Sequence, residues 1–163
     1  MTRFPYAPRL AALSLAIATA LSGSPAFADD DEGENFGAVT DPVVKQECSA
    51  CHMAFSPAML PAKSWEAITG NLADHYGDNA SLDAATTAAV RDWLVANASQ
   101  PNRWMVNAAD GGDTPMRITE TAWWVSVHDH EVRPSRFTDP KVGSKANCTA
   151  CHRGAEQGYF EDD

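Results

Sequence analysis

Apolar residues recur every three or four positions over residues 64–76, 81–98 and 119–130, and this spacing predicts three amphipathic helices. A shorter helix is expected to start at Pro42 and run into the first pair of cysteines. The connector over residues 99–116 is rich in Asn, Gly and Pro, as exposed loops are. No useful stretch alternates apolar and polar residues in the way of a half-buried strand. The pattern therefore predicts an all-α fold, a small and mainly helical domain with long loops.

The first of these helices carries a histidine at the end of its apolar face. Ser64 is the expected N-cap, and Gly77 is the expected stop. The face between them collects Trp65, Ile68, Leu72 and His75. A buried imidazole needs a partner for its ring nitrogens, either a backbone carbonyl or a metal. His75 is therefore a candidate metal ligand.

The other two helices differ in the chemistry of their faces. The second, with Ser81 as its expected N-cap, has an aliphatic and aromatic face and is interpreted as scaffold. The third is expected to begin near Thr119 and carries His128 and His130. Either imidazole could reach a metal, and His128 lies one turn after Trp124.

One pentapeptide pattern, Cys-x-x-Cys-His, occurs at residues 48–52 and again at 148–152. This is the spacing of covalent haem c attachment. Two cysteines three positions apart can form thioethers to the two vinyl groups of one porphyrin, and the next histidine then binds the iron as its proximal ligand. The two copies use every cysteine of the chain, and we expect two covalently attached haem c groups with iron. The residues involved are Cys48, Cys51, His52, Cys148, Cys151 and His152.

Three other uses of the cysteine pairs compete with haem attachment. Two pairs can hold one structural zinc ion, but zinc ribbons usually place their pairs closer together and need no histidine after each. Two disulfides would suit an exported chain, but such frameworks are typical of short chains with dense cysteines. A thioredoxin-like redox pair needs a βαβ pattern, which the sequence lacks.

The start of the chain has the features of an export signal. Arg3 and Arg9 accompany an apolar run over residues 10–21 that is too short to span a membrane, and residues 26–28 read Ala-Phe-Ala. Haem is attached to c-type cytochromes outside the bacterial cytoplasmic membrane, so this leader and the motifs together predict a periplasmic protein. No later segment is apolar enough for a membrane helix, so no membrane insertion is expected after cleavage. The expected organisation is a signal peptide (1–28), a disordered or loosely docked N-terminus (29–41) and a dihaem domain (42–163).

The chain is acidic, with a formal net charge of −10 at pH 7. Nucleic acids and acidic membrane surfaces repel such a chain, which argues against both as partners. The charge favours a protein partner with a basic docking face, although solubility alone also accounts for it.

The residues that complete the iron coordination decide the chemistry. A second histidine keeps the reduction potential lower, a methionine raises it, and an open position lets the iron bind or activate a small molecule. The candidates outside the motifs are His75, His128, His130, Met53, Met59, Met105 and Met116. Met59 is the best methionine, in a stiff loop, but a lone methionine near a haem more often only packs. His75 and His128 lie on separate predicted helices, so we expect two histidine ligands at each iron.

Several stretches resemble the dihaem cytochrome c family, whose members serve as redox partners of the oxygen-binding sphaeroides haem protein. They are Cys48 to His52 with Pro57 and Leu60-Pro61, Ser64-Trp65, Asp74 to Leu82, Arg117 to Thr121, the tryptophan pair with His128, and Asn147 to His152. The resemblance implies that His75 is the distal ligand of the first haem and His128 that of the second. It also implies two partners, a soluble haem protein and a membrane b-type cytochrome.

The family pattern has one histidine after the tryptophan pair, whereas this chain has two. Counting forward from Trp123 favours His128, and counting backward from the acidic residue that follows favours His130. We take His128. The sequence thus predicts a dihaem c-type cytochrome that carries electrons and is not an enzyme. The alternative is a haem enzyme or gas sensor in which one iron keeps an open or displaceable axial position.

Overall fold

The computed structural model describes residues 34–161, together with Met1. Residues 34–161 belong to one compact unit. The expected signal peptide and its cleavage site lie, apart from Met1, outside the described residues. Over residues 34–161, no helix combines the length and the apolar character that a membrane span requires.

The described chain is mainly helical. Its α-helices are α1 (Pro42–Cys48), α2 (Ala62–Thr69), α3 (Ala84–Ala96) and α4 (Ala122–His128). Short 3-10 turns lie between and after them: η1 (Pro57–Met59), η2 (Leu72–Asp74), η3 (Ile118–Glu120), η4 (Pro134–Arg136), η5 (Cys148–Ala150) and η6 (Ala155–Gln157). Its strands are two residues long, β1 (Glu34–Asn35) antiparallel to β2 (Tyr159–Phe160). The predicted all-α fold with long loops is confirmed.

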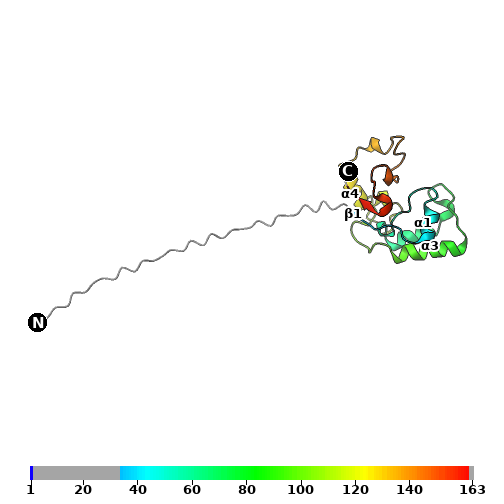
Figure 1. The fold of residues 1–163 in the computed structure, drawn as a ribbon, viewed down its shortest axis with the longest axis horizontal. Helices are drawn as coiled ribbons and strands as arrows, with labels where there is room; N and C mark the ends of the chain where they lie inside the picture. The colour runs from blue at the N-terminus through cyan, green and yellow to red at the C-terminus, as the bar shows by residue number, and fades with distance from the viewer. Residues whose placement is uncertain (2–33, 162–163) are drawn as a thin grey trace. The chain divides into compact units, whose positions relative to one another are not determined.

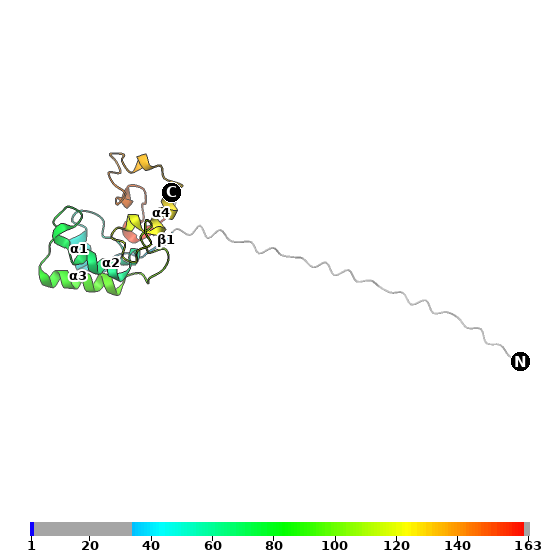
Figure 2. The ribbon, with the colours of Figure 1, turned by 180° about the vertical axis from the view of Figure 1, so that it is seen from behind.

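Helix α3 packs against both α1 and α2, and the three helices gather together in Figures 1 and 2. Helix α4 and the orange segment that follows it lie beside this group in both views. One hydrophobic cluster nevertheless draws on all four helices and on the Pro-rich loop before α2. Its members include Val44, Met59, Leu60, Trp65, Val90, Leu94, Trp123 and Trp124. The two halves of the chain therefore share a core, which holds the two cysteine motifs in one domain.

Helix α3 begins later than predicted. Asp83, rather than Ser81, is its N-cap, and the Asp83 carboxylate accepts hydrogen bonds from the backbone N–H groups of Ala85 and Thr86. The backbone N–H of Ser81 instead donates to the side chain of Asn79 at 3.0 Å. This local Asx turn competes with the helix and delays its start.

The starts of α2 and α4 also differ from the prediction. Helix α2 begins at Ala62, so Ser64 lies inside it and is buried rather than acting as its cap. The N-cap of α4 is Thr121 rather than Thr119, because residues 118–120 form the 3-10 turn η3.

His75 does not continue the apolar face of α2, as predicted, but lies in a turn after it. Helix α2 ends at Thr69, and the next residue is Gly70, which favours a stop. After η2 the backbone N–H of His75 donates to the carbonyl of Asp78 at 2.8 Å, and Gly77 has a φ of 102°. The expected helical stripe through His75 is therefore wrong, although the residue remains half-buried.

The segment before α1 packs on the domain. Strand β1 pairs with β2, the hydroxyl of Ser56 donates to the carbonyl of Phe36 at 2.6 Å, and Val39 is buried. The expected disorder is therefore wrong for residues 34–41, while residues 29–33 lie outside the described part. Phe36 and Val39 are isolated apolar residues in an acidic, Gly-containing stretch without periodicity. No sequence pattern therefore predicted that they would pack on the domain.

Candidate haem sites

Helix α1 brings the first motif to the surface of the core. Its N-cap is Asp41, and it ends at Cys48. The Cys48 side chain is partly buried, and this burial, with a smaller contribution from the charge of Glu47, raises the pKa of its thiol. Cys51 and His52 follow in an exposed turn. One sulfur of the pair therefore faces the interior and the other faces outward.

The ring of His75 lies opposite the ring of His52. Their centroids are 6.2 Å apart, and their planes are inclined by 25°. A metal–imidazole bond is about 2 Å long, so a metal ion between two imidazoles separates their ring centroids by about 6 Å. The turn after η2 thus places His75 at the spacing that a shared iron requires.

The second motif begins in η5 and closes a helical turn. The backbone N–H of His152 donates to the carbonyl of Cys148 at 2.8 Å. Burial raises the pKa of the Cys148 thiol to about 11, whereas the neighbouring Cys151 is exposed. The two motifs therefore share the arrangement of a buried first sulfur and an exposed second one.

The ring of His128 lies opposite that of His152. Their centroids are 6.1 Å apart, and their planes are inclined by 82°. His128 is the last residue of α4, while His130 follows beyond the helix and is exposed. The structure therefore brings His128, rather than His130, to the second motif.

Three of these four imidazoles have one nitrogen bound to the backbone. The Nδ1 of His52 lies 2.6 Å from the carbonyl oxygen of Met53. The Nδ1 of His128 lies 2.9 Å from the carbonyl oxygen of Trp124, and that of His152 lies 3.2 Å from the carbonyl oxygen of Glu161. A carbonyl only accepts, so Nδ1 carries the proton and Nε2 keeps its lone pair for a metal.

The surroundings of the fourth imidazole, that of His75, disfavour its charged form. The pKa of His75 is lowered mainly by burial, and then by electrostatic interaction with His52 and Arg117, with Asp78 opposing them. Because a metal binds the neutral form of histidine, these surroundings favour ligation.

Aromatic rings lie against the imidazoles of His52, His128 and His152, and two of these rings were not expected from the sequence. Phe55 stacks on His52 with centroids 4.8 Å apart, and Phe160 lies edge-on to His152 at 5.3 Å. The ring of Trp124 stacks on His128 at 4.2 Å, as their separation by one helical turn predicted. Single phenylalanines in loops carry no periodic signal, so only the structure connects Phe55 and Phe160 with these sites.

The sequence model of the dihaem cytochrome c family matches residues 44–160. This chain belongs to that family. A structure of DHC purified from Rhodobacter sphaeroides is 46% identical to it, with a TM-score of 0.63, and a diheme cytochrome c from Rhodobacter sphaeroides is 41% identical, with a TM-score of 0.65. Each similarity covers 76% of this chain and 99% of the other. A diheme cytochrome type c from Shewanella baltica is 41% identical, with a TM-score of 0.60, over 74% of this chain and 86% of that one. Among curated proteins, none matches the chain.

This dihaem cytochrome c carries two covalently bound haem c groups, as predicted, and its cysteine pairs fit their attachment. None of the four cysteines forms a disulfide. Over residues 34–161, no three His, Cys, Asp or Glu side chains converge as the ligands of a zinc ion would. Two pairs of imidazoles with the spacing that a shared iron requires, each beside a cysteine pair without a disulfide, fit a haem at each motif.

The methionine candidates and the tryptophans lie mostly in the core. Met59 is only 1% exposed and belongs to the hydrophobic cluster, and Met105 is also buried there. The Nε1–H of Trp65 donates to the carbonyl of Pro57 at 2.8 Å, which ties the Pro-rich loop to α2. These contacts favour a packing role for Met59.

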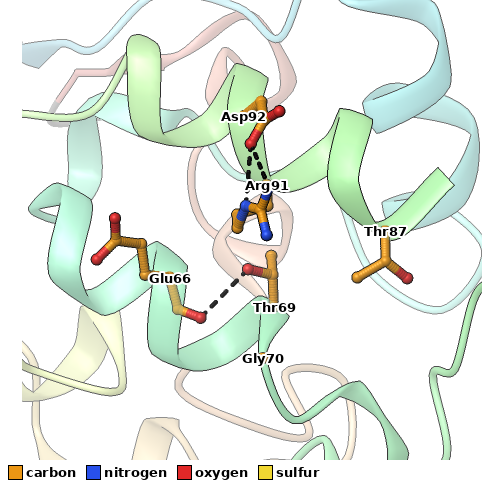
Figure 3. A pocket seen from close by; sticks show the side chains of 6 residues that line it. All are labelled: Glu66, Thr69, Gly70, Thr87, Arg91 and Asp92. Carbon is orange, nitrogen blue, oxygen red and sulfur yellow. Dashed lines mark hydrogen bonds and ion pairs between the residues drawn. The ribbon is translucent and has the colours of Figure 1, made fainter. Parts of the chain in front are cut away.

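Helices α2 and α3 also border an open hollow of about 680 Å³, shown in Figure 3. Glu66 and Thr69 line it from α2, and Arg91, held by the carboxylate of Asp92 at 2.7 Å, lines it from α3. No cysteine or histidine lines it, so it is separate from the dihaem cytochrome's two candidate sites.

Proposed function

We propose that this dihaem cytochrome c is a periplasmic electron carrier in which each iron has two histidine ligands. The ligands are His52 and His75 at the first haem, and His152 and His128 at the second. The observation that carries the proposal is the opposition of the imidazole rings, with centroids 6.2 and 6.1 Å apart. With these ligands bound, side chains would occupy both axial positions of each iron and leave none for a substrate, and the haems would supply one-electron exchange.

The chain tunes this exchange through the second nitrogen of its ligands. A hydrogen bond from Nδ1–H to a backbone carbonyl fixes the ring orientation and makes Nε2 a stronger electron-pair donor to the iron. Two imidazoles also keep the reduction potential lower than histidine with methionine does. Each contribution supports a low-potential carrier rather than an open catalytic haem.

The proposed partners are a membrane b-type cytochrome as donor and a soluble haem protein as acceptor. The family resemblance and the predicted leader support this assignment and a periplasmic location. The net charge of −10 favours a basic docking face on one partner. Exposed basic residues, in contrast, concentrate on the stretch that carries the second motif: Arg133, Arg136, Lys141, Lys145 and Arg153. The chain as a whole is acidic, whereas the stretch around the second motif carries exposed basic side chains. The two surfaces therefore suit two partners of different charge.

Replacing the proposed first distal ligand tests this function. We expect His75→Met to raise the reduction potential of one haem by on the order of 0.1 V, within the ~0.8 V range that axial ligands set. The other haem should keep its potential in a spectroelectrochemical titration. Met59→Leu, a nearly volume-conserving change in the core, is the matched control and should move neither potential. A shift at neither haem in His75→Met would remove His75 from the ligand set.

The absorption spectrum distinguishes the proposed electron carrier from a haem enzyme or gas sensor. Two bis-histidine irons should be low-spin in both oxidation states, with slow binding of carbon monoxide after reduction. High-spin bands, or rapid carbon monoxide binding by the unmodified protein, would favour the alternative with an open axial position.

A further inference from the structure

The turn that carries His75 has a strained backbone. Tyr76, the next residue, has a φ of 58°, and it is the only non-glycine residue of the described chain with a positive φ. This left-handed conformation is unfavourable for a tyrosine because of its Cβ atom. Such strain persists only where surrounding contacts hold the residue in place. The contacts of Tyr76 therefore indicate what keeps the turn, and His75 with it, in position.

The side chain of Tyr76 reaches across to a segment forty residues later in the chain. Its hydroxyl donates a hydrogen bond to the carbonyl of Met116. The guanidinium carbon of Arg117 lies 4.0 Å from the centroid of the Tyr76 ring, as in a cation–π contact. Tyr76 is 43% exposed, so these two contacts, rather than burial, hold its side chain. We call this group of Tyr76, Met116 and Arg117 the Tyr76 clasp.

The far side of the clasp is firmly anchored. Arg117 immediately precedes η3, in which Ile118 is buried. The Nε of Arg117 lies 3.5 Å from Oε1 of Glu120. Thr121, the N-cap of α4, follows and is fully buried. The clasp therefore fastens an exposed turn to the rigid start of the helix that carries His128.

We propose that Tyr76 and Arg117 are positioning residues that hold His75 against the iron of the first haem. The proposal rests on the proposed ligation by His75. The Tyr76 ring lies 4.8 Å from the His75 ring, inclined by 60°, so it limits how the imidazole can swing. The Arg117 guanidinium lies over the Tyr76 ring, which itself contacts His75, and a nearby cation disfavours the ferric state of a bound iron. The clasp thus controls both ligand retention and potential at one haem.

Tyr76→Phe tests ligand retention in the haem-loaded protein. It removes the hydroxyl that bonds to Met116 but keeps the ring beneath Arg117. We expect carbon monoxide to displace one ligand of the reduced protein about two- to tenfold faster, the range that the loss of one hydrogen bond supports. Tyr159→Phe is the matched control, because Tyr159 is 40% exposed and lies in β2, apart from His75. It should leave the rate unchanged.

Arg117→Gln tests the electrostatic part. We expect a lower potential at the first haem only, since the change removes a positive charge that opposes oxidation, while Arg117→Lys should keep most of the potential. Arg103→Gln is the control, because the Arg103 guanidinium also lies over an aromatic ring, 4.8 Å from that of Trp104. Equal shifts at both haems, or in both arginine variants, would overturn the electrostatic role.

His75→Met, measured alongside, separates this proposal from the proposed function. If His75→Met moves one potential while Tyr76→Phe and Arg117→Gln move neither rate nor potential, the clasp is refuted and the ligand assignment stands. If His75→Met moves neither potential, the ligand assignment itself fails, and the clasp fails with it.

Discussion

At the scale of the residue, one hydrogen bond decides which nitrogen of an imidazole can serve a metal. Helix α4 places the Nδ1 of His128 2.9 Å from the carbonyl of Trp124, one turn earlier. The same geometry lays the Trp124 ring parallel to the imidazole, inclined by only 11°. His130, two residues later, has left the helix and is exposed. The two side chains have the same chemistry, but helix α4 ends between them, so only His128 is held beside His152.

This difference predicts unequal effects of two matched substitutions. We expect His128→Asn to leave the second iron with one imidazole, giving high-spin bands and rapid carbon monoxide binding at one haem. His130→Asn should leave both haems low-spin. Absorption spectra of the reduced proteins, with and without carbon monoxide, measure both effects. The reverse outcome would make His130 the ligand.

At the scale of the element, short helices depend on their caps because few turns support them. Helix α4 has seven residues, and its cap Thr121 is fully buried. The hydroxyl of Thr121 accepts from the backbone N–H of Trp124 at 3.1 Å and donates to the carbonyl of Ile118 at 2.8 Å. One side chain therefore joins η3 to α4 and so supports the position of His128.

Removing this cap should destabilise the protein. We expect Thr121→Ala to lower the free energy of unfolding by about 1–2 kcal/mol, since the backbone N–H and carbonyl both lose a buried partner. Thr121→Ser keeps the hydroxyl and should recover most of that loss. Denaturant unfolding followed by circular dichroism in the haem band measures the difference. Thr119→Ala, outside the helix, is the control, and a loss as large as that of Thr121→Ala would contradict the capping role.

At the scale of the whole domain, the two ends of the described chain meet beside the second haem site. The backbone N–H of Phe36 donates to the carbonyl of Gly158 at 2.8 Å, and the ring of Phe36 lies 5.9 Å from that of Phe160. Phe160 in turn contacts His152, whose Nδ1 is bound to the carbonyl of Glu161. The closure of the domain and the support of a proximal histidine therefore depend on the same few residues.

Gly158 makes this closure possible, because a Cβ atom there would collide with the backbone of Gly37. We expect Gly158→Ala to lower the free energy of unfolding by at least about 1 kcal/mol, through this clash and its φ of 80°. Gly143→Ala is the matched control, since Gly143 has a φ of 76° but open space around it. Thermal unfolding of both variants gives the comparison. Equal losses would show that backbone strain alone, and not the closure, accounts for the effect.

Much of the architecture was predictable because it depends on local patterns. The periodicity of α3 and the Pro-interrupted loop before α2 led to the right elements. The errors fall where local preferences compete. Ser81 is a good cap by type, but the Asx turn at Asn79 holds it outside the helix. The predicted apolar face leading to His75 ran across Gly70, but helix α2 stops there.

The chemistry that depends on neighbouring residues could be predicted from the sequence. Two Cys-x-x-Cys-His motifs specify two haem c groups because thioether bonds and a proximal ligand need only that local spacing. Only the folded chain shows that a turn, and not the predicted helix, brings His75 to His52, which carbonyls contact the second nitrogens, and how Tyr76 meets Arg117. The two ring pairs and the contact of Tyr76 with Arg117 join segments 23 to 41 residues apart in the chain. No local periodicity encodes such distances, and only the packing of the shared core brings the segments together.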